Sequence, residues 1–419
     1  MPLACDWKSR EDLLLDLKAL KERYTRCHEP IVSPDGKTVA VPVETEDGDW
    51  TMCVNGKLWE GAFERIWAAR FGSSGQLVAL VKSDDQWAVA VDGKSWDQSF
   101  EFIWNLEISP DGSHIAAQVK KGDEYTIIVN GKPWERSFVS MREFCVDDQG
   151  NVAATVQLEP VKEADIFAFA KGSWGVAYNG KPWGGTYINA YSPAVSPDGK
   201  GASAQVRVGR CEYTIAEDGI VWNERFGCTW EQVYHPKRGT VIAPATLPGG
   251  GWSLVENGKP LWSRRYVQLW RPVVSGGAGR IAAIASPSFG RWTIAVDDEP
   301  WAVTFGDVVL KPVFSPDGGR VAAVVKDDGR WTIAADGAPW DESFDMVWDP
   351  VFDPSGGMVA AKVERGGKYT IALDGTAWKR WFDGICDPVF SPDGKDVLIR
   401  CLEDGKFYRR IIPVSELAG

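Results

Sequence analysis

The chain has 419 residues, of which 44% are hydrophobic and 25% charged, a composition typical of a globular protein with a large core. Its formal net charge of −12 leaves no basic footprint for phosphates, which argues against nucleic-acid binding. Residues 1–24 lack the basic and apolar regions of a secretory signal, and no apolar run approaches the length of a membrane-spanning helix. We therefore expect a cytoplasmic protein without direct membrane insertion, which could be peripheral at the inner face of the membrane through its partners.

The first predicted element is an amphipathic helix within a separate N-terminal segment, residues 1–27. Ser9 is a suitable N-cap, and acidic residues follow it in the first turn. Apolar residues then recur at helical spacing and form one face: Leu13, Leu17, Leu20 and Tyr24. That face needs a surface to pack on, either the rim of the following domain or another subunit. The three leucines are therefore candidate docking residues.

Residues 28–419 form a second domain, which is a tandem repeat. The tetrapeptide SPDG occurs at 33–36, 109–112, 196–199, 315–318 and 391–394, and degenerate forms between them give ten units with a period of about 39 residues. Each unit reads as a short strand, an SPDG turn, two further strands, an NG or DG turn and a short fourth strand. Four short antiparallel strands are typical of a propeller blade.

We therefore predict an all-β fold, a large β-propeller of about ten four-stranded repeats with one N-terminal α-helix. An open array or two smaller rings are the alternatives, because ten units exceed the usual blade number. The tenth unit ends before its fourth strand, and residues 23–27 could supply that strand and close the ring.

The repeat is interrupted in its fourth unit by an insertion of about ten residues near 158–170. Phe167 and Phe169 lie in this insertion and are flanked by alanines. Loops on a regular scaffold carry function more often than the scaffold does. The insertion is therefore either a partner-docking loop, with these two phenylalanines as candidate contacts, or a lengthened hairpin that folds its aromatic side chains back.

Tryptophan is unusually frequent, with 22 residues, and nine of them close the second turn of a unit. A residue that recurs in every blade does the same job in every blade, so we predict that these side chains pack neighbouring blades together. The alternative is an exposed ring that binds glycans or peptides. The nine structural repeat aromatics are Trp59, Trp96, Trp134, Trp183, Trp222, Trp262, Trp301, Trp340 and Trp378.

Motifs that carry chemistry are absent from the sequence. The histidines are His28, His114 and His235, and none has a neighbour at metal-binding spacing. The eight cysteines show no CxxC or zinc-ribbon spacing, so most are expected to be buried, reduced thiols. A phosphate-binding loop, a dinucleotide fingerprint and a nucleophile elbow are also missing. We predict no catalytic residue, no metal site and no cofactor.

The repeats resemble those of TolB-like and WD40-like propellers over residues 30–412. The charged helical N-terminus, the density of NGKPW-type units and the missing signal peptide are also similar to the tryptophan-rich cytoplasmic subunits of the Tmc transmembrane electron-transfer complexes of sulfate-reducing bacteria. This resemblance implies a cofactor-free accessory protein that associates with an iron–sulfur subunit and a cytochrome-b-like membrane subunit. It implies no catalytic residue.

The leading functional hypothesis is thus a non-catalytic scaffold or interaction subunit of a membrane-associated redox complex. The second is a tryptophan-rich propeller module that binds glycans or peptides. The third is a propeller enzyme with a site in the central channel, whose polar residues would come one or two per blade and would not form a local motif.

Overall fold

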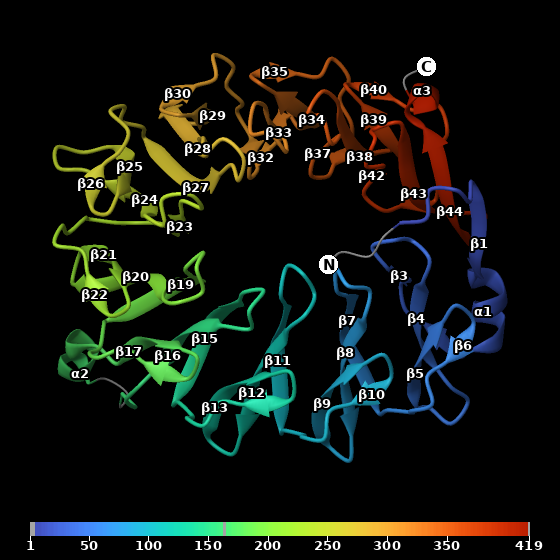
Figure 1. The fold of residues 1–419 in the computed structure, drawn as a ribbon, viewed down its shortest axis with the longest axis horizontal. Coiled ribbons are helices and arrows are strands. Elements are labelled where there is room, and N and C mark those ends of the chain that lie inside the picture. Colours follow the sequence, from blue (N-terminus) through green and yellow to red (C-terminus); the bar gives the residue numbers. More distant parts are fainter. Residues whose placement is uncertain (1–4, 162–164, 418–419) are drawn as a thin grey trace.

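The structure is a computed structural model that describes residues 5–161 and 165–417. Ten antiparallel sheets stand side by side in one ring, and the chain passes around this ring once (Figure 1). The prediction of an all-β propeller with ten four-stranded blades is therefore confirmed, and the chain forms neither an open array nor two smaller rings. In some blades the innermost strand is broken into two short pieces.

The first five blades lie between residues 26 and 221. Blade 1 comprises β2 (Arg26–Cys27), β3 (Ile31–Val32), β4 (Val39–Glu44), β5 (Trp50–Val54) and β6 (Lys57–Leu58). Blade 2 comprises β7 (Arg65–Phe71), β8 (Leu77–Ser83), β9 (Gln86–Val91) and β10 (Lys94–Ser95). Blade 3 comprises β11 (Phe102–Ile108), β12 (Ile115–Lys121), β13 (Glu124–Val129) and β14 (Lys132–Pro133). Blade 4 comprises β15 (Ser140–Val146), β16 (Val152–Gln157), β17 (Trp174–Tyr178) and β18 (Lys181–Pro182), with α2 (Ile166–Lys171) between β16 and β17. Blade 5 comprises β19 (Asn189–Val195), β20 (Ala202–Gly209), β21 (Glu212–Glu217) and β22 (Ile220–Val221).

The next four blades follow the same order. Blade 6 comprises β23 (Val233–Tyr234), β24 (Val241–Thr246), β25 (Trp252–Glu256) and β26 (Lys259–Pro260). Blade 7 comprises β27 (Gln268–Val274), β28 (Ile281–Ser288), β29 (Arg291–Val296) and β30 (Glu299–Pro300). Blade 8 comprises β31 (Val308–Val309), β32 (Val313–Phe314), β33 (Val321–Asp327), β34 (Arg330–Ala335) and β35 (Ala338–Pro339). Blade 9 comprises β36 (Met346–Val347), β37 (Val351–Phe352), β38 (Val359–Arg365), β39 (Lys368–Leu373) and β40 (Thr376–Ala377).

Blade 10 closes the ring because both ends of the chain contribute to it. Its inner strands are β41 (Gly384–Ile385), β42 (Val389–Phe390), β43 (Asp396–Glu403) and β44 (Lys406–Pro413), and α3 (Val414–Leu417) follows them. The outer strand is β1 (Glu11–Asp16), which pairs antiparallel with β44. The N-terminal part of the chain thus closes the ring as predicted, but with residues 11–16 in place of 23–27. Residues 26–27 instead form β2 of blade 1.

The N-terminal helix begins later than predicted. α1 spans Leu17–Arg23, and its N-cap is Asp16, which accepts hydrogen bonds from the N–H groups of Lys18 and Ala19, whereas the prediction placed the N-cap at Ser9. Leu13 shares the helical apolar spacing of Leu17 and Leu20, but the open edge of β44 offers residues 11–16 a ladder of inter-strand hydrogen bonds. Tertiary pairing therefore overrides the local pattern.

Each blade is buried on both faces by its neighbours. The second strand shows this most clearly, since Val39–Val43 in β4 and Val321–Val325 in β33 are buried without interruption. Clusters of buried side chains combine residues of adjacent blades, such as Val324 of blade 8 with Val363 of blade 9. Burial on both faces explains why these strands read as continuous apolar runs and do not alternate with polar residues.

Arg409 joins the two ends of the chain at the seam between blades 10 and 1. Its side chain is fully buried, and its guanidinium donates to the carbonyl oxygens of Ser9 at 3.2 Å, of Asp35 at 3.3 Å and of Asp6. It also lies 3.5 Å from Oδ2 of Asp12. A buried charge is tolerated where hydrogen bonds and a counter-charge satisfy it, and here they tie β44, the N-terminal segment and blade 1 together.

Candidate functional site

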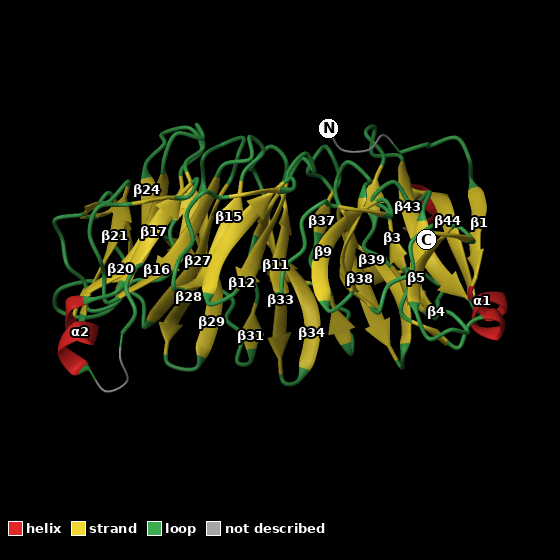
Figure 2. Cartoon of the chain, turned by 90° about the horizontal axis from the view of Figure 1, so that it is seen from below, coloured by secondary structure: helices red, strands yellow, loops and turns green. Residues whose placement is uncertain are grey.

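The ring has two faces, which differ in the connections they carry. The SPDG turns and the NG or DG turns lie on one side, here called the turn face. The hairpins between the second and third strands lie on the opposite side, here called the hairpin face. Figure 2 shows α1 and α2 on the hairpin face, away from the N-terminal end of the chain.

The SPDG turns satisfy their own polar groups. In the first of them, Ser33 Oγ donates to Asp35 Oδ1 at 2.5 Å, and this oxygen also accepts from the N–H of Lys37 at 3.1 Å. In the other turns the serine hydroxyl bonds hold the pKa of the aspartate below its usual range, at Asp111, Asp198, Asp317 and Asp393. Turn closure therefore accounts for these recurrent carboxylates.

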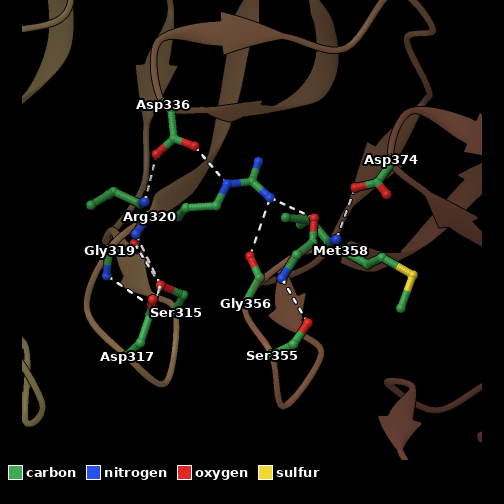
Figure 3. Close-up of polar contacts among 12 residues, drawn as sticks. Ser315, Asp317, Gly319, Arg320, Asp336, Ser355, Gly356, Met358 and Asp374 are labelled. Atoms are coloured by element: carbon green, nitrogen blue, oxygen red, sulfur yellow. Dashed lines mark hydrogen bonds and ion pairs between the residues drawn. The ribbon is translucent and has the colours of Figure 1, made fainter. Parts of the chain in front are cut away.

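The Asn or Asp that opens each NG or DG turn makes a further hydrogen bond, which the sequence motif does not reveal. In nine blades its side-chain oxygen accepts a hydrogen bond from the start of the second strand, as Asn130 Oδ1 does from the Ile115 N–H at 2.8 Å. In blade 8 the second carboxylate oxygen of Asp336 also accepts from Arg320 Nε at 2.7 Å (Figure 3). Arg320 reaches the Gly357 carbonyl of blade 9 at 2.7 Å, so this contact crosses a seam.

The nine turn tryptophans lie at the seams between blades. Trp222, Trp262 and Trp378 are buried, and the other six are half-buried. Each belongs to a cluster of apolar side chains from neighbouring blades. In six seams the indole covers the turn glycine of the next blade, and a Cβ added at Gly93 would come within 3.0 Å of Trp59 Cγ. These side chains do not form an exposed ring.

The three N-terminal leucines have different surroundings. Leu17 and Leu20 of α1 are buried against Val41, Cys53 and other residues of blades 1 and 10. The propeller's own rim thus packs against this helix, and the side chains of Leu17 and Leu20 are almost inaccessible from solvent. Leu13 lies on β1 at the outer edge of blade 10 and remains 54% exposed.

The insertion in blade 4 forms the short helix α2, with residues 162–164 outside the described part of the chain. Asp165 caps the helix by accepting from the Ala168 N–H at 2.9 Å. Gly172 ends it at φ 90°, where a Cβ would meet the backbone of Tyr187 at 2.4 Å. None of the α2 residues is buried, and Phe167 is 83% exposed, with Ile166 and Phe169 exposed beside it. The insertion therefore does not fold its aromatic side chains back.

Most exposed large apolar side chains of the described chain lie on the hairpin face, in hairpins or at the start of innermost strands. Phe289 is at the tip of the β28–β29 hairpin and is 93% exposed. On this face the exposed set is Trp67, Phe102, Ile166, Phe167, Phe169, Trp230, Val267 and Phe289. Elsewhere the exposed set is Leu13, Leu58 and Ile220. The turn motifs gave no signal of this asymmetry. Of this set, Phe167 and Phe169 were identified from the sequence, because they lie in the insertion that breaks the repeat.

The histidines and cysteines form no recognisable reaction centre in residues 5–161 and 165–417. His28 packs against Trp50, His114 Nδ1 contacts the Ser113 hydroxyl at 2.8 Å, and His235 Nε2 contacts the Gly279 carbonyl at 3.2 Å. All eight cysteines are free of disulfide bonds, and one of them, Cys211, is exposed. Burial raises the pKa of the Cys401 thiol to about 11. Within those residues there is no cluster of side chains able to hold a metal ion.

The helices of the described chain are short, and none is long and apolar enough to cross a membrane.

No protein-family model matches the chain, and no curated protein matches it. Its fold is similar to that of many solved structures. One is a eukaryotic initiation factor, at 11% identity and a TM-score of 0.46, with 90% of this chain and 97% of that chain covered. Another is the Dos1 propeller, at 9% identity and a TM-score of 0.38, with 96% and 94% covered. A third is the tricorn protease, at 11% identity and a TM-score of 0.33, with 94% of this chain but 43% of that chain covered.

Proposed function

We propose that this chain is a non-catalytic interaction scaffold that docks a partner protein on its hairpin face. The observation that carries the proposal is α2, an insertion that no other blade has and that presents Ile166, Phe167 and Phe169 to solvent. The other blades join their second and third strands by short hairpins, so the propeller does not require this helix in order to fold.

The energetics of the exposed side chains favour a docking role. Burying a large apolar side chain is worth roughly 1.5–3 kcal/mol relative to leaving it in water, so three of them on one turn of helix are a substantial driving force. Aromatic side chains at the centre of a contact commonly dominate binding energy. Phe289 and Trp230 extend the apolar character of the same face beyond α2. Exposed apolar groups gathered on one face are typical of an interaction surface.

For the partner, we propose the iron–sulfur and cytochrome-b-like subunits of a membrane-bound redox complex. The sequence resemblance to tryptophan-rich Tmc subunits supports this proposal. In such a complex the scaffold would carry no cofactor and would lie peripherally at the inner face of the membrane through its partners.

The test is co-purification from the native cells in mild detergent, with mass spectrometry of the retained proteins. The wild-type chain is expected to retain the iron–sulfur and cytochrome-b-like subunits. The Phe167→Ser/Phe169→Ser variant should lose roughly tenfold or more of them, because two aromatic contacts together are worth at least about 1.4 kcal/mol. Ile220→Ser is the matched control, since Ile220 is 76% exposed on the turn face, and it should retain them fully.

Equal retention by the Phe167→Ser/Phe169→Ser variant would contradict docking through α2. Recovery of a stable partner that depends on Phe167 but is no redox subunit would keep the scaffold and remove the redox assignment.

A further inference from the structure

A cavity of about 670 Å³ lies between blades 1 and 2 on the hairpin face. Its walls include Trp50, Trp67 and Trp87. The rings of Trp67 and Trp87 meet edge to face, with centroids 6.3 Å apart, and His28 packs on Trp50 at 4.6 Å. Trp67 is 53% exposed, so an aromatic face is open to a ligand.

In three other blades, the aromatic residue that opens the third strand is covered by a cation from the second strand. The two are cross-strand partners, and the charged group lies over the ring. The pairs are Lys120 over Tyr125 at 5.9 Å, Arg207 over Tyr213 at 5.8 Å and Lys326 over Trp331 at 5.0 Å. The fold thus repeatedly uses this position for a cation–π contact.

Blades 1 and 2 are among the blades that lack this contact within the described part of the chain. In blade 6 the cross-strand partner of Trp252 is Thr246, and in blade 9 the partner of Tyr369 is Glu364, although Lys362 lies 5.7 Å from the Tyr369 ring. The cross-strand partner of Trp50 is Glu44, an acid in the place of the cation. The partner of Trp87 is Lys82, but its ammonium turns away to Glu64 at 3.1 Å and Asp85 at 2.5 Å. Two tryptophans on this face are therefore left with carboxylates nearby and without a cation over the ring.

The charge around the cavity is negative. Hydrogen bonds from the Asp85 N–H and from Lys82 hold the pKa of Glu64 below its usual range, so this wall stays charged. Glu44 Oε2 is shielded from solvent and accepts no hydrogen bond from the described chain, although Arg26 Nε lies 3.2 Å away. The cavity walls carry Arg26 and Arg65 together with Glu44 and Glu64, and the excess of acid comes from the two bordering hairpins, which add Glu46, Asp47, Asp49, Asp84 and Asp85 against Lys82.

We propose that this cavity binds a cationic side chain, lysine or arginine, from a basic segment of a partner protein. Its charged group would lie against Trp50, Trp67 and Trp87 and pair with Glu44 and Glu64, which supplies the contact that Lys120 and Lys326 make internally in their blades. The inference rests on the proposed function, because it names the chemistry of the partner that the hairpin face recognises.

The test uses the full chain and two fluorescent peptides, a hexalysine and the same peptide with acetylated side chains, with binding followed by anisotropy. Hexalysine should bind and the acetylated peptide should not. Trp67→Ala should weaken hexalysine binding about five- to thirtyfold, the range expected from losing a partly desolvated cation–π contact. Glu44→Gln should weaken it about fivefold or more, and added salt should weaken it further.

Trp230→Ala is the matched control. Trp230 holds the same place in the first strand region of blade 6 and is 40% exposed, but the neighbouring hairpin 247–251 carries no charge. This variant should bind hexalysine like the wild type. Tryptophan is uncharged, so neither substitution changes the net charge of the chain. If hexalysine binding is weakened in Trp67→Ala but not in Trp230→Ala, the acidic net charge therefore cannot explain the difference.

Equal binding by Trp67→Ala, with thermal unfolding and circular dichroism unchanged, would overturn the inference, as would equal binding of the acetylated peptide or no binding of hexalysine. The Phe167→Ser/Phe169→Ser variant should bind hexalysine normally. If hexalysine does not bind while partner retention still depends on Phe167, the cavity inference fails and the proposed function stands. If hexalysine binds at Trp67 while no partner is retained, the cavity inference stands and the proposed function fails.

Discussion

The turn face and the hairpin face of this propeller are built from the same ten repeats. The recurrent polar side chains of the turn face are hydrogen-bonded within the chain, whereas the hairpin face exposes apolar side chains to solvent. On the turn face, Ser33 and Asp35 bond to each other, and Asn130 accepts from a neighbouring strand. On the hairpin face, Phe167, Phe289 and Trp67 point into solvent. Features that recur in every blade hold the ring together, whereas the surface that we propose for docking is formed by the insertion in blade 4 and by aromatic side chains that stay exposed in single blades.

The sharpest test of this difference compares one tryptophan from each face. Trp262 is 5% exposed at a seam, and its truncation to alanine should destabilise the fold by about 3–5 kcal/mol, as expected for a buried aromatic side chain. Trp230→Ala removes a ring that is 40% exposed and stacks on Trp252, and it should cost less, about 1–2 kcal/mol. Urea unfolding followed by circular dichroism measures both. Similar midpoints for the two variants would remove the distinction between the faces.

The seam where the chain ends meet should be the next most sensitive place. Arg409→Met leaves the carbonyl oxygens of Ser9 and Asp35 without their buried donor and should destabilise the fold by about 3 kcal/mol. The control Arg210→Met changes an exposed arginine and should have little effect. An unchanged urea midpoint for Arg409→Met would show that β1 does not depend on this residue for closing the ring.

A smaller effect is expected at the turn residue Asn130. Asn130→Ala loses the bond to the Ile115 N–H and places alanine at φ 46°, which together should cost about 1–2 kcal/mol. Asn130→Asp should be nearly neutral, because aspartate makes the same bond at Asp92 and Asp336. A loss as large for aspartate as for alanine would contradict the hydrogen-bonding role. Thermal unfolding of both variants decides this.

The smallest effect concerns pH. The pKa of Asp317 is lowered in the folded chain, first by the Ser315 hydroxyl, so its carboxylate stabilises the fold above its unfolded pKa of about 3.9. That contribution is lost as the pH falls through the lower folded value. Asp317→Asn should therefore reduce the decline of the urea midpoint as the pH falls from about 5 through the unfolded pKa and towards the lower folded pKa. The exposed Asp123→Asn should leave the decline unchanged, and an equal change in both would contradict the turn role.

The blades could be predicted from sequence because their turns are local. Asn130 and Gly131 both have positive φ, as an NG hairpin turn requires, and the motif states this directly. The strand at residues 11–16 could not be predicted, since the edge of β44 that it pairs with exists only once the ring has formed. The role of Asn130 in binding Ile115 was missed for a similar reason, because the contact joins a turn to a strand across the blade.

The surface that we propose for docking was only partly visible in the sequence. The insertion with Phe167 and Phe169 could be found because it breaks the period. Leu17 and Leu20 looked equivalent to them, but the rim of blades 1 and 10 buries both. The cavity depended on cross-strand register, since Glu44 can be compared with Lys120 and Lys326 only after each is paired with its aromatic neighbour.

Hydrogen–deuterium exchange of the purified complex against the free chain tests docking on the hairpin face most directly. Partner binding should slow exchange in residues 166–173 and in the hairpin at 288–291, while the turn-face segments 196–201 and 218–222 should exchange as in the free chain. Slowing confined to the turn-face segments, with 166–173 unchanged, would contradict the account.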